Sequence, residues 1–240
     1  MFKLLSTANP KIQKGTKLGY LSFILHLAPA TLSGKNTCPK ATPGCIAACL
    51  NTAGRGGMFK RGETTNTIQK ARIRKTEYFF ADREAFMADL ASDIRKGIKL
   101  AAKLGLKPVF RLNGTSDLAW EKYEVSGFEN IFAMFPDVQF YDYTKIFGRK
   151  VQGIKNYFLL FSAADGNDAD VRLAVAAGMN ISVVFDKLPE TFMGLVVVDA
   201  DETDLRFLDP KGVVAGLKAK GRAKKDTSGF VRRVIPITVA

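Results

Sequence analysis

The stretch Leu18-Gly19-Tyr20-Leu21-Ser22-Phe23-Ile24-Leu25-His26-Leu27 is largely apolar, with aliphatic and aromatic side chains over most of its length. Five further runs have the same character, at residues 109–112, 138–141, 157–161, 181–185 and 194–198. Nearly continuous apolar runs are typical of parallel strands covered on both faces, whereas antiparallel strands usually alternate. The sequence therefore predicts six strands in a mainly parallel sheet.

Helical patterns lie between some of these runs. Residues 82–104 and 168–177 carry apolar side chains at helical spacing, and each segment is followed by a glycine, Gly105 or Gly178, the residue that commonly ends a helix. We therefore expect an α/β fold, namely a partial six-stranded (βα) barrel of the TIM type with a cysteine loop after strand 1. We expect residues 1–240 to form a single barrel-like domain with basic N- and C-terminal segments.

The composition is that of an ordinary globular protein. The 240 residues are 47% hydrophobic and 25% charged, and about 150 residues per domain is the usual guide. No apolar run approaches the roughly 18 residues that a membrane span requires. We expect a protein that does not enter a membrane and that acts in the cytoplasm.

Positive charge is concentrated near both ends of the chain. The formal net charge is +13; residues 1–75 hold thirteen Lys and Arg but one acid, Glu63, and residues 211–233 hold eight but one acid, Asp226. Such a field attracts nucleic acid, another polyanion or a phosphorylated small molecule. A solvated basic surface that serves solubility is the alternative.

All three cysteines fall within twelve residues. Cys38, Cys45 and Cys49 have the spacing Cys-x6-Cys-x3-Cys, which favours a metal site over a disulfide framework. Three soft ligands without a fourth cysteine suit a 4Fe-4S cluster that leaves one iron open to another ligand. Structural zinc with His26 as fourth ligand is the alternative; His26 could equally be a core residue, and the cysteines could be three buried thiols.

Polar residues follow most of the predicted strands. Because the carboxyl ends of parallel strands meet at one edge of a sheet, these residues predict a shared pocket. Each is also a residue type that turns and helix caps require. The candidates are Asn113, Gly114, Ser116 and Asp117 after the second strand, Asp142 and Lys145 after the third, Ser162 after the fourth and Asp201 after the sixth.

A strand, a three-cysteine loop at its end and five further strands resemble the radical S-adenosylmethionine enzymes. Their partial barrel holds a 4Fe-4S cluster through three cysteines, and the open iron binds S-adenosylmethionine. The pattern here departs from theirs, because their cysteine gaps are three and two residues and an aromatic residue stands beside the last cysteine. Their glycine-containing, acidic turn after the second strand is matched in kind only by Gly114 and Asp117.

Other sequence segments are similar to those of a family of phage and prophage proteins. This second resemblance covers nearly the whole chain. The segments are Asn36-Thr37-Cys38-Pro39, Thr52-Ala53-Gly54-Arg55-Gly56, Arg111-Leu112-Asn113-Gly114-Thr115-Ser116-Asp117 and Asp209-Pro210-Lys211-Gly212-Val213-Val214. The resemblance implies that a phage or prophage encodes the chain, so that the cytoplasm in which it acts is that of a host cell. It implies no reaction.

Together these observations give three hypotheses. In the first, a radical S-adenosylmethionine-like enzyme holds its cluster through the cysteines; Asn113, Gly114, Ser116, Asp117 and Ser162 bind the cofactor, and Asp117, Asp142, Lys145 and Asp201 face the substrate. In the second, the chain binds nucleic acid and the cysteines form a structural zinc clip. In the third, a hydrolase uses Asp199, Asp201 and Asp204 to bind Mg²⁺, although these carboxylates could equally form ion pairs.

Overall fold

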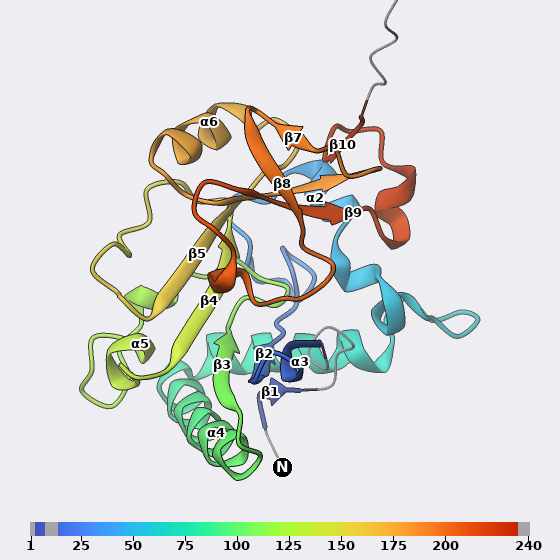
Figure 1. The fold of residues 1–240 in the computed structure, drawn as a ribbon. Helices are drawn as coiled ribbons and strands as arrows, with labels where there is room; N and C mark the ends of the chain where they lie inside the picture. The colour runs from blue at the N-terminus through green and yellow to red at the C-terminus, as the bar shows by residue number, and fades with distance from the viewer. Residues whose placement is uncertain (1–2, 8–13, 235–240) are drawn as a thin grey trace, which may run out of the picture.

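The computed structural model describes residues 3–7 and 14–234 (Figure 1). Its strands belong to one ten-stranded sheet. They are β1 (Leu5–Ser6), β2 (Tyr20–Leu25), β3 (Lys107–Arg111), β4 (Gln139–Thr144), β5 (Tyr157–Ser162), β6 (Ile181–Phe185), β7 (Thr191–Phe192), β8 (Leu195–Asp199), β9 (Val214–Lys218) and β10 (Val231–Arg232). The α-helices are α2 (Pro43–Ala47), α3 (Thr67–Ala81), α4 (Arg83–Lys103), α5 (Ile131–Met134) and α6 (Asp168–Ala176).

Five short 3₁₀ helices complete the described elements: η1 (Leu50–Thr52), η2 (Gly54–Gly57), η3 (Trp120–Lys122), η4 (Arg206–Leu208) and η5 (Gly221–Lys225). The strand order is β1-β2-β3-β4-β5-β6-β9-β8-β7, and β10 pairs with β6. All neighbours from β2 to β8 are parallel, whereas β1 and β7 are antiparallel to their partners at the two edges.

The predicted partial six-stranded (βα) barrel is wrong, although all six predicted strands are present. The sheet is mixed and open, because the antiparallel strands β1 and β7 end its two edges. A strand that the sequence pattern missed, β9, lies between β6 and β8, so the order in space differs from the order along the chain. No α-helix separates β4 from β5 or β8 from β9, which removes the regular βα alternation of a barrel.

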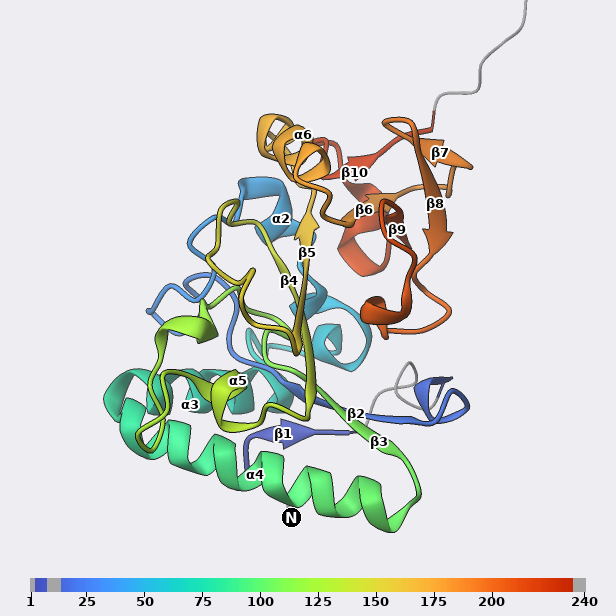
Figure 2. The ribbon, with the colours of Figure 1, turned by 60° about the vertical axis from the view of Figure 1, so that its left-hand side comes forward.

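The main core lies between the long helices and the first strands of the parallel run. Phe86 and Ile94 of α4 are fully buried against Phe23 of β2 and Phe110 of β3, whose rings stack at 5.0 Å. Figure 2 shows α3 and α4 together at this end of the molecule. Both predicted helices exist, as α4 and α6.

The sequence pattern did not predict the helix α3, because two of its three buried residues, Gln69 and Thr76, are polar. Its apolar periodicity is therefore weak. None of the helices in residues 3–7 and 14–234 has both the length and the apolar character that crossing a bilayer requires.

The segment after β3 runs so close to the end of β2 that only glycine fits. The Gly114 amide donates to the Leu25 carbonyl at 2.9 Å. A Cβ atom at residue 114 would lie 2.6 Å from Ile24 Cγ2 and 2.7 Å from the Leu25 carbonyl oxygen. This close approach brings the segment that contains Asp117 beside the segment that leads to the cysteines.

The variant Gly114→Ala should therefore lower the free energy of unfolding by about 1–3 kcal/mol, the usual cost of overpacking. Gly153→Ala is the matched control, because a Cβ atom there would meet nothing within 4 Å; its effect should stay within about 1 kcal/mol. Urea unfolding followed by circular dichroism measures both. An equal change in the free energy of unfolding in the two variants would contradict the close packing at Gly114.

Candidate functional site

A buried threonine fixes the start of the cysteine loop. The Thr37 hydroxyl donates to the Ala28 carbonyl at 2.5 Å, and its own carbonyl accepts from the Asp117 amide at 2.8 Å. The next residue, Cys38, places its sulfur 3.8 Å from the Thr115 carbonyl oxygen. Cys38 is thereby held between the segments that follow β2 and β3.

A carboxylate from the other side of the site fixes α2. Asp165, in the segment that follows β5, accepts hydrogen bonds from the amides of Gly44 at 2.9 Å and Cys45 at 3.1 Å and from the Thr42 hydroxyl. A Cβ atom at Gly44 would lie only 2.6 Å from Asp165 Oδ1, so glycine is needed for this approach. Cys45 is thus tied to the carboxyl end of β5.

The three thiols are free and half-buried. Cys49 interacts with both Cys45 and Cys38, and its sulfur accepts from the Asn51 amide at 3.5 Å. Burial raises the pKa of Cys49 to about 11, and burial also raises the pKa of Cys38. Both are protonated at neutral pH unless an added positive charge stabilises the thiolate.

Lys145 supplies one such charge. It stands directly after β4, its ammonium group hydrogen-bonds Cys45, and its amide donates to Asp117 Oδ2 at 2.8 Å. Burial acts to lower the pKa of Lys145, but Cys45 and Asp117 outweigh it, so the pKa is raised. A second cation, Arg72 of α3, interacts with Cys49 and donates to Asn51 Oδ1.

A cavity of about 320 Å³ adjoins this group of side chains. Its lining includes Lys40 and Thr42 of the cysteine loop, Lys145 itself and Asn167 at the start of α6. Ligand pockets in proteins begin at about this size. A small molecule in the cavity would contact Lys145, which also contacts Cys45.

Two of the predicted site residues belong to the cysteine group, and they contact each other. These are Asp117 and Lys145. Asp117 is buried, burial raises its pKa, and Arg149 lies 3.7 Å from its carboxylate. This pair links the ends of β3 and β4 to the thiols.

Other predicted residues are engaged in internal hydrogen bonds. Asn113 Oδ1 accepts from the Ser116 hydroxyl at 2.9 Å and from the indole of Trp120 at 3.1 Å, which closes the loop after β3. The hydroxyls of Ser162 and Ser182 lie 2.9 Å apart. The side chains of Asn113, Ser116 and Ser162 are thus hydrogen-bonded within the protein.

Asp142 is fully buried on β4. It accepts from the Asn113 amide at 2.7 Å and from the Tyr157 hydroxyl at 3.2 Å. Burial raises its pKa to about 7, against the opposing effect of Arg111.

The carboxylates near the end of β8 form ion pairs. Asp201 pairs with Lys220 at 2.6 Å, and Asp199 pairs with Lys218 at 2.8 Å. Asp204 pairs with Arg111 at 3.1 Å. This is the ion-pair alternative that the sequence left open for the proposed magnesium site.

Among the residues that the structure describes, no three Cys, His, Asp or Glu side chains are grouped closely enough to hold a metal ion. His26 has a basic neighbourhood: burial together with the charges of Arg72, Arg111 and Lys75 lowers its pKa to about 3. It is therefore neutral at physiological pH.

Sequence reasoning missed three residues that shape the site: Asp165, Arg72 and Arg149. Asp165 follows a predicted strand, so the strand-end rule that found Asp117 could have found it. Arg72 lies on the unpredicted α3. Arg149 is buried between Glu121 and Asp117, a pairing that no local pattern reveals.

The fold and this site define an open-sheet α/β protein with three thiols at the carboxyl ends of its parallel strands. The family model of Gene product 88 matches residues 3–234, so the chain belongs to the Gene product 88 family. This match confirms the expected phage protein family. No curated protein and no solved structure matches the chain, so these comparisons give no support to the resemblance to radical S-adenosylmethionine enzymes.

Replacing Asp165 should loosen α2. In Asp165→Ala the amides of Gly44 and Cys45 lose their acceptor, which costs about 1–3 kcal/mol, and amide hydrogen exchange should accelerate over residues 42–49. The control is Asp170→Ala, because Asp170 forms no hydrogen bond to α2 in the described structure. Unchanged exchange in Asp165→Ala would show that the carboxylate does not hold the helix.

The raised pKa of Asp142 predicts a pH-dependent stability. Between about pH 4 and 7 the unfolded chain releases the Asp142 proton while the folded chain keeps it, so rising pH removes stability, by at most ~1.4 kcal/mol per pH unit. The variant Asp142→Asn should lack this loss. Urea unfolding at pH 4.5, 6 and 7.5 measures the difference between the two proteins, and the exposed substitution Asp137→Asn is the control. A difference that does not change with pH would contradict the assignment.

Proposed function

We propose that Cys38, Cys45 and Cys49 bind an iron–sulfur cluster. The observation that supports this most is the convergence of four sheet segments on the thiols: Cys38 follows β2, and Asp117, Lys145 and Asp165 follow β3, β4 and β5. Cys45 and Cys38 both act electrostatically on Cys49. Soft thiolate ligands select clusters, zinc or copper over hard cations.

The number of cysteines favours a cluster over a single zinc ion. A structural zinc site takes four protein ligands, whereas three thiolates suffice for a 4Fe-4S cluster that keeps one iron open. The described side chains include no group tight enough for one ion, and His26 stands among cations. A structural zinc clip is therefore the weaker candidate.

The electrostatic surroundings suit a negatively charged group. Three thiolates carry negative charge that burial penalises, and Lys145 at Cys45 and Arg72 at Cys49 offset it. Lysine and arginine are also hydrogen-bond donors that tune a cluster from its surroundings.

The chain offers three cysteines and no fourth, so a 4Fe-4S cluster would keep one iron open to another ligand. We propose S-adenosylmethionine as that ligand, which would supply radical chemistry when bound. The cavity lined by Lys145 and by Lys40 and Thr42 of the cysteine loop would hold a small molecule beside Lys145. Lys145 would orient its carboxylate, and Asp117 would hold the Lys145 backbone in place.

Anaerobic reconstitution with iron and sulfide tests the proposal. The purified chain should gain about four irons and a broad visible absorbance from charge transfer between thiolate and iron. Cys38→Ser, Cys45→Ser and Cys49→Ser should each lose most of this absorbance. Ile46→Ser is the control, because Ile46 is 52% exposed on the same helix and has no thiol.

Circular dichroism separates a lost ligand from a lost fold in each variant. One zinc and no iron per chain, or full iron content in the cysteine variants, would overturn the cluster. Equilibrium dialysis of the reconstituted protein with S-adenosylmethionine then tests the ligand separately. A brown protein that fails to bind it would retain the cluster assignment and reject the ligand.

A further inference from the structure

The two most basic segments of the chain lie side by side beside the cysteine loop. Ala223 of η5 is buried in one apolar cluster with Ala48, the residue before Cys49. A Cβ atom at Gly221 would lie 3.5 Å from Ala53 Cα. In Figure 1 the red segment around η5 accordingly runs next to the pale blue segment that follows α2. Folding thus joins basic residues that are more than 150 positions apart.

Six cations of these two segments form what we call the basic face: Arg55, Lys60, Arg61, Arg222, Lys224 and Lys225. All six are exposed, and none forms an ion pair with a described residue. The preceding lysines differ, because Lys218 and Lys220 are paired with Asp199 and Asp201. The basic face therefore carries positive charge that no ion pair with a described residue neutralises.

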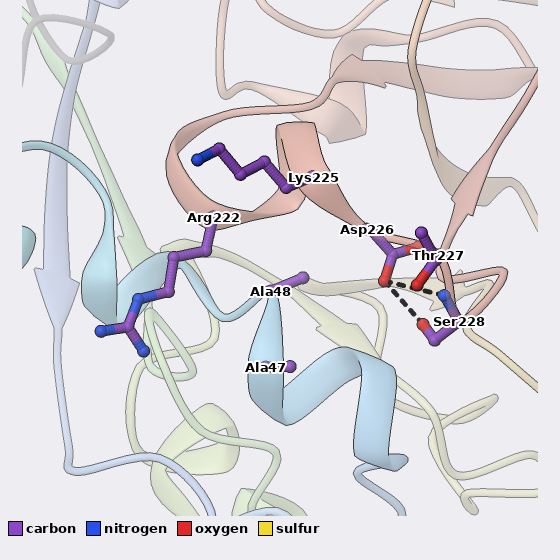
Figure 3. Close-up of a pocket in the computed structure, with 7 residues that line it drawn as sticks. All are labelled: Ala47, Ala48, Arg222, Lys225, Asp226, Thr227 and Ser228. Carbon is purple, nitrogen blue, oxygen red and sulfur yellow. Dashed lines mark hydrogen bonds between the residues drawn. The ribbon is translucent and has the colours of Figure 1, made fainter.

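A hollow of about 350 Å³ lies within this face. Its walls are Ala47 and Ala48 from the cysteine loop and the turn from Arg222 to Ser228 (Figure 3). Figure 3 shows the side chains of Arg222 and Lys225 extending to one side, away from the hydrogen-bonded Asp226 and Ser228. The Asp226 carboxylate accepts from the Ser228 hydroxyl at 2.6 Å and from the Val231 amide at 2.9 Å, so it is already engaged within the turn.

Apolar side chains are exposed among the same cations. Leu50, Met58 and Phe59 have exposed fractions of 55%, 71% and 37%. Cations that follow a phosphate backbone, combined with apolar and aromatic surfaces on which bases stack, are the features by which proteins bind single strands. A duplex would present its phosphates but would keep its bases away from Phe59.

We propose that a single-stranded nucleic acid binds across the basic face. Its phosphates lie against the arginines and lysines, a base stacks on Phe59, and one nucleotide occupies the hollow behind α2. Ala47 and Ala48 line that hollow and stand between Cys45 and Cys49 in the sequence, so the strand would pass close to the thiols. This surface is formed by the protein alone and does not depend on a cluster.

Fluorescence anisotropy with a labelled 20-nucleotide DNA of mixed sequence, and with the matching RNA, tests the proposal. The combined substitution R222A/K224A/K225A should weaken binding at least tenfold in about 50 mM salt. It should also reduce the slope of log affinity against log salt by about 2, because each phosphate contact on a single strand contributes roughly 0.7. Phe59→Ala should weaken binding while leaving the salt slope unchanged.

The control is R95A/K99A/K103A, which removes the same charge from α4 at the other end of the molecule (Figure 1). An equal loss of affinity in the two triple variants would attribute binding to net charge and overturn the assigned face. So would duplex DNA that competes as well as the single strand, or no binding at 50 mM salt. Repeating the measurement with Cys38→Ser separates strand binding from any failure of the cluster.

Discussion

The hydrogen bonds of Asp165 to α2 are the constraint on which the candidate site depends. A five-residue helix has no stability of its own, and α2 contains a single buried residue, Gly44. The Asp165 carboxylate holds the start of the helix by accepting hydrogen bonds from two backbone amides and one hydroxyl. Because Asp165 follows β5, these bonds place Cys45 at the carboxyl ends of the parallel strands. Cys38 reaches the same place independently, because it lies in the segment that follows β2.

Parallel strands make this convergence possible. The connections that follow β2, β3, β4 and β5 leave the sheet at the same edge, and each supplies one residue of the group: Cys38, Asp117, Lys145 and Asp165. An antiparallel sheet would have sent alternate connections to the opposite edge. The site therefore needs parallel neighbours, but it does not need a closed barrel, and the open sheet meets the requirement.

The sequence predicted the features that local chemistry determines. Apolar runs predicted the strands beside which the candidate site lies. The strand-end rule selected Asp117 and Lys145, which the structure places together beside Cys45. The rule also selected Asp201, but the strand β8 lies beyond β9, and Asp199 and Asp201 pair with Lys218 and Lys220. The prediction of a barrel was wrong for a physical reason. Strand order and edge pairing are decided by contacts between distant residues, and β9, with Gly216 in its centre, has too weak a local signal to reveal them.

The distribution of charge connects the thiols with the basic face. Most acids occur in the middle of the chain, and several are used internally: Asp117 and Glu121 surround Arg149, and Asp204 meets Arg111. Carboxylates committed to buried arginines cannot also neutralise surface lysines. Lys218 and Lys220 are paired with Asp199 and Asp201, whereas the six cations of the basic face form no ion pair with a described residue. The contact of Ala223 with Ala48 places Arg222, Lys224 and Lys225 beside the helix that carries Cys45. A single strand bound as proposed would therefore lie beside the segment that carries Cys45 and Cys49.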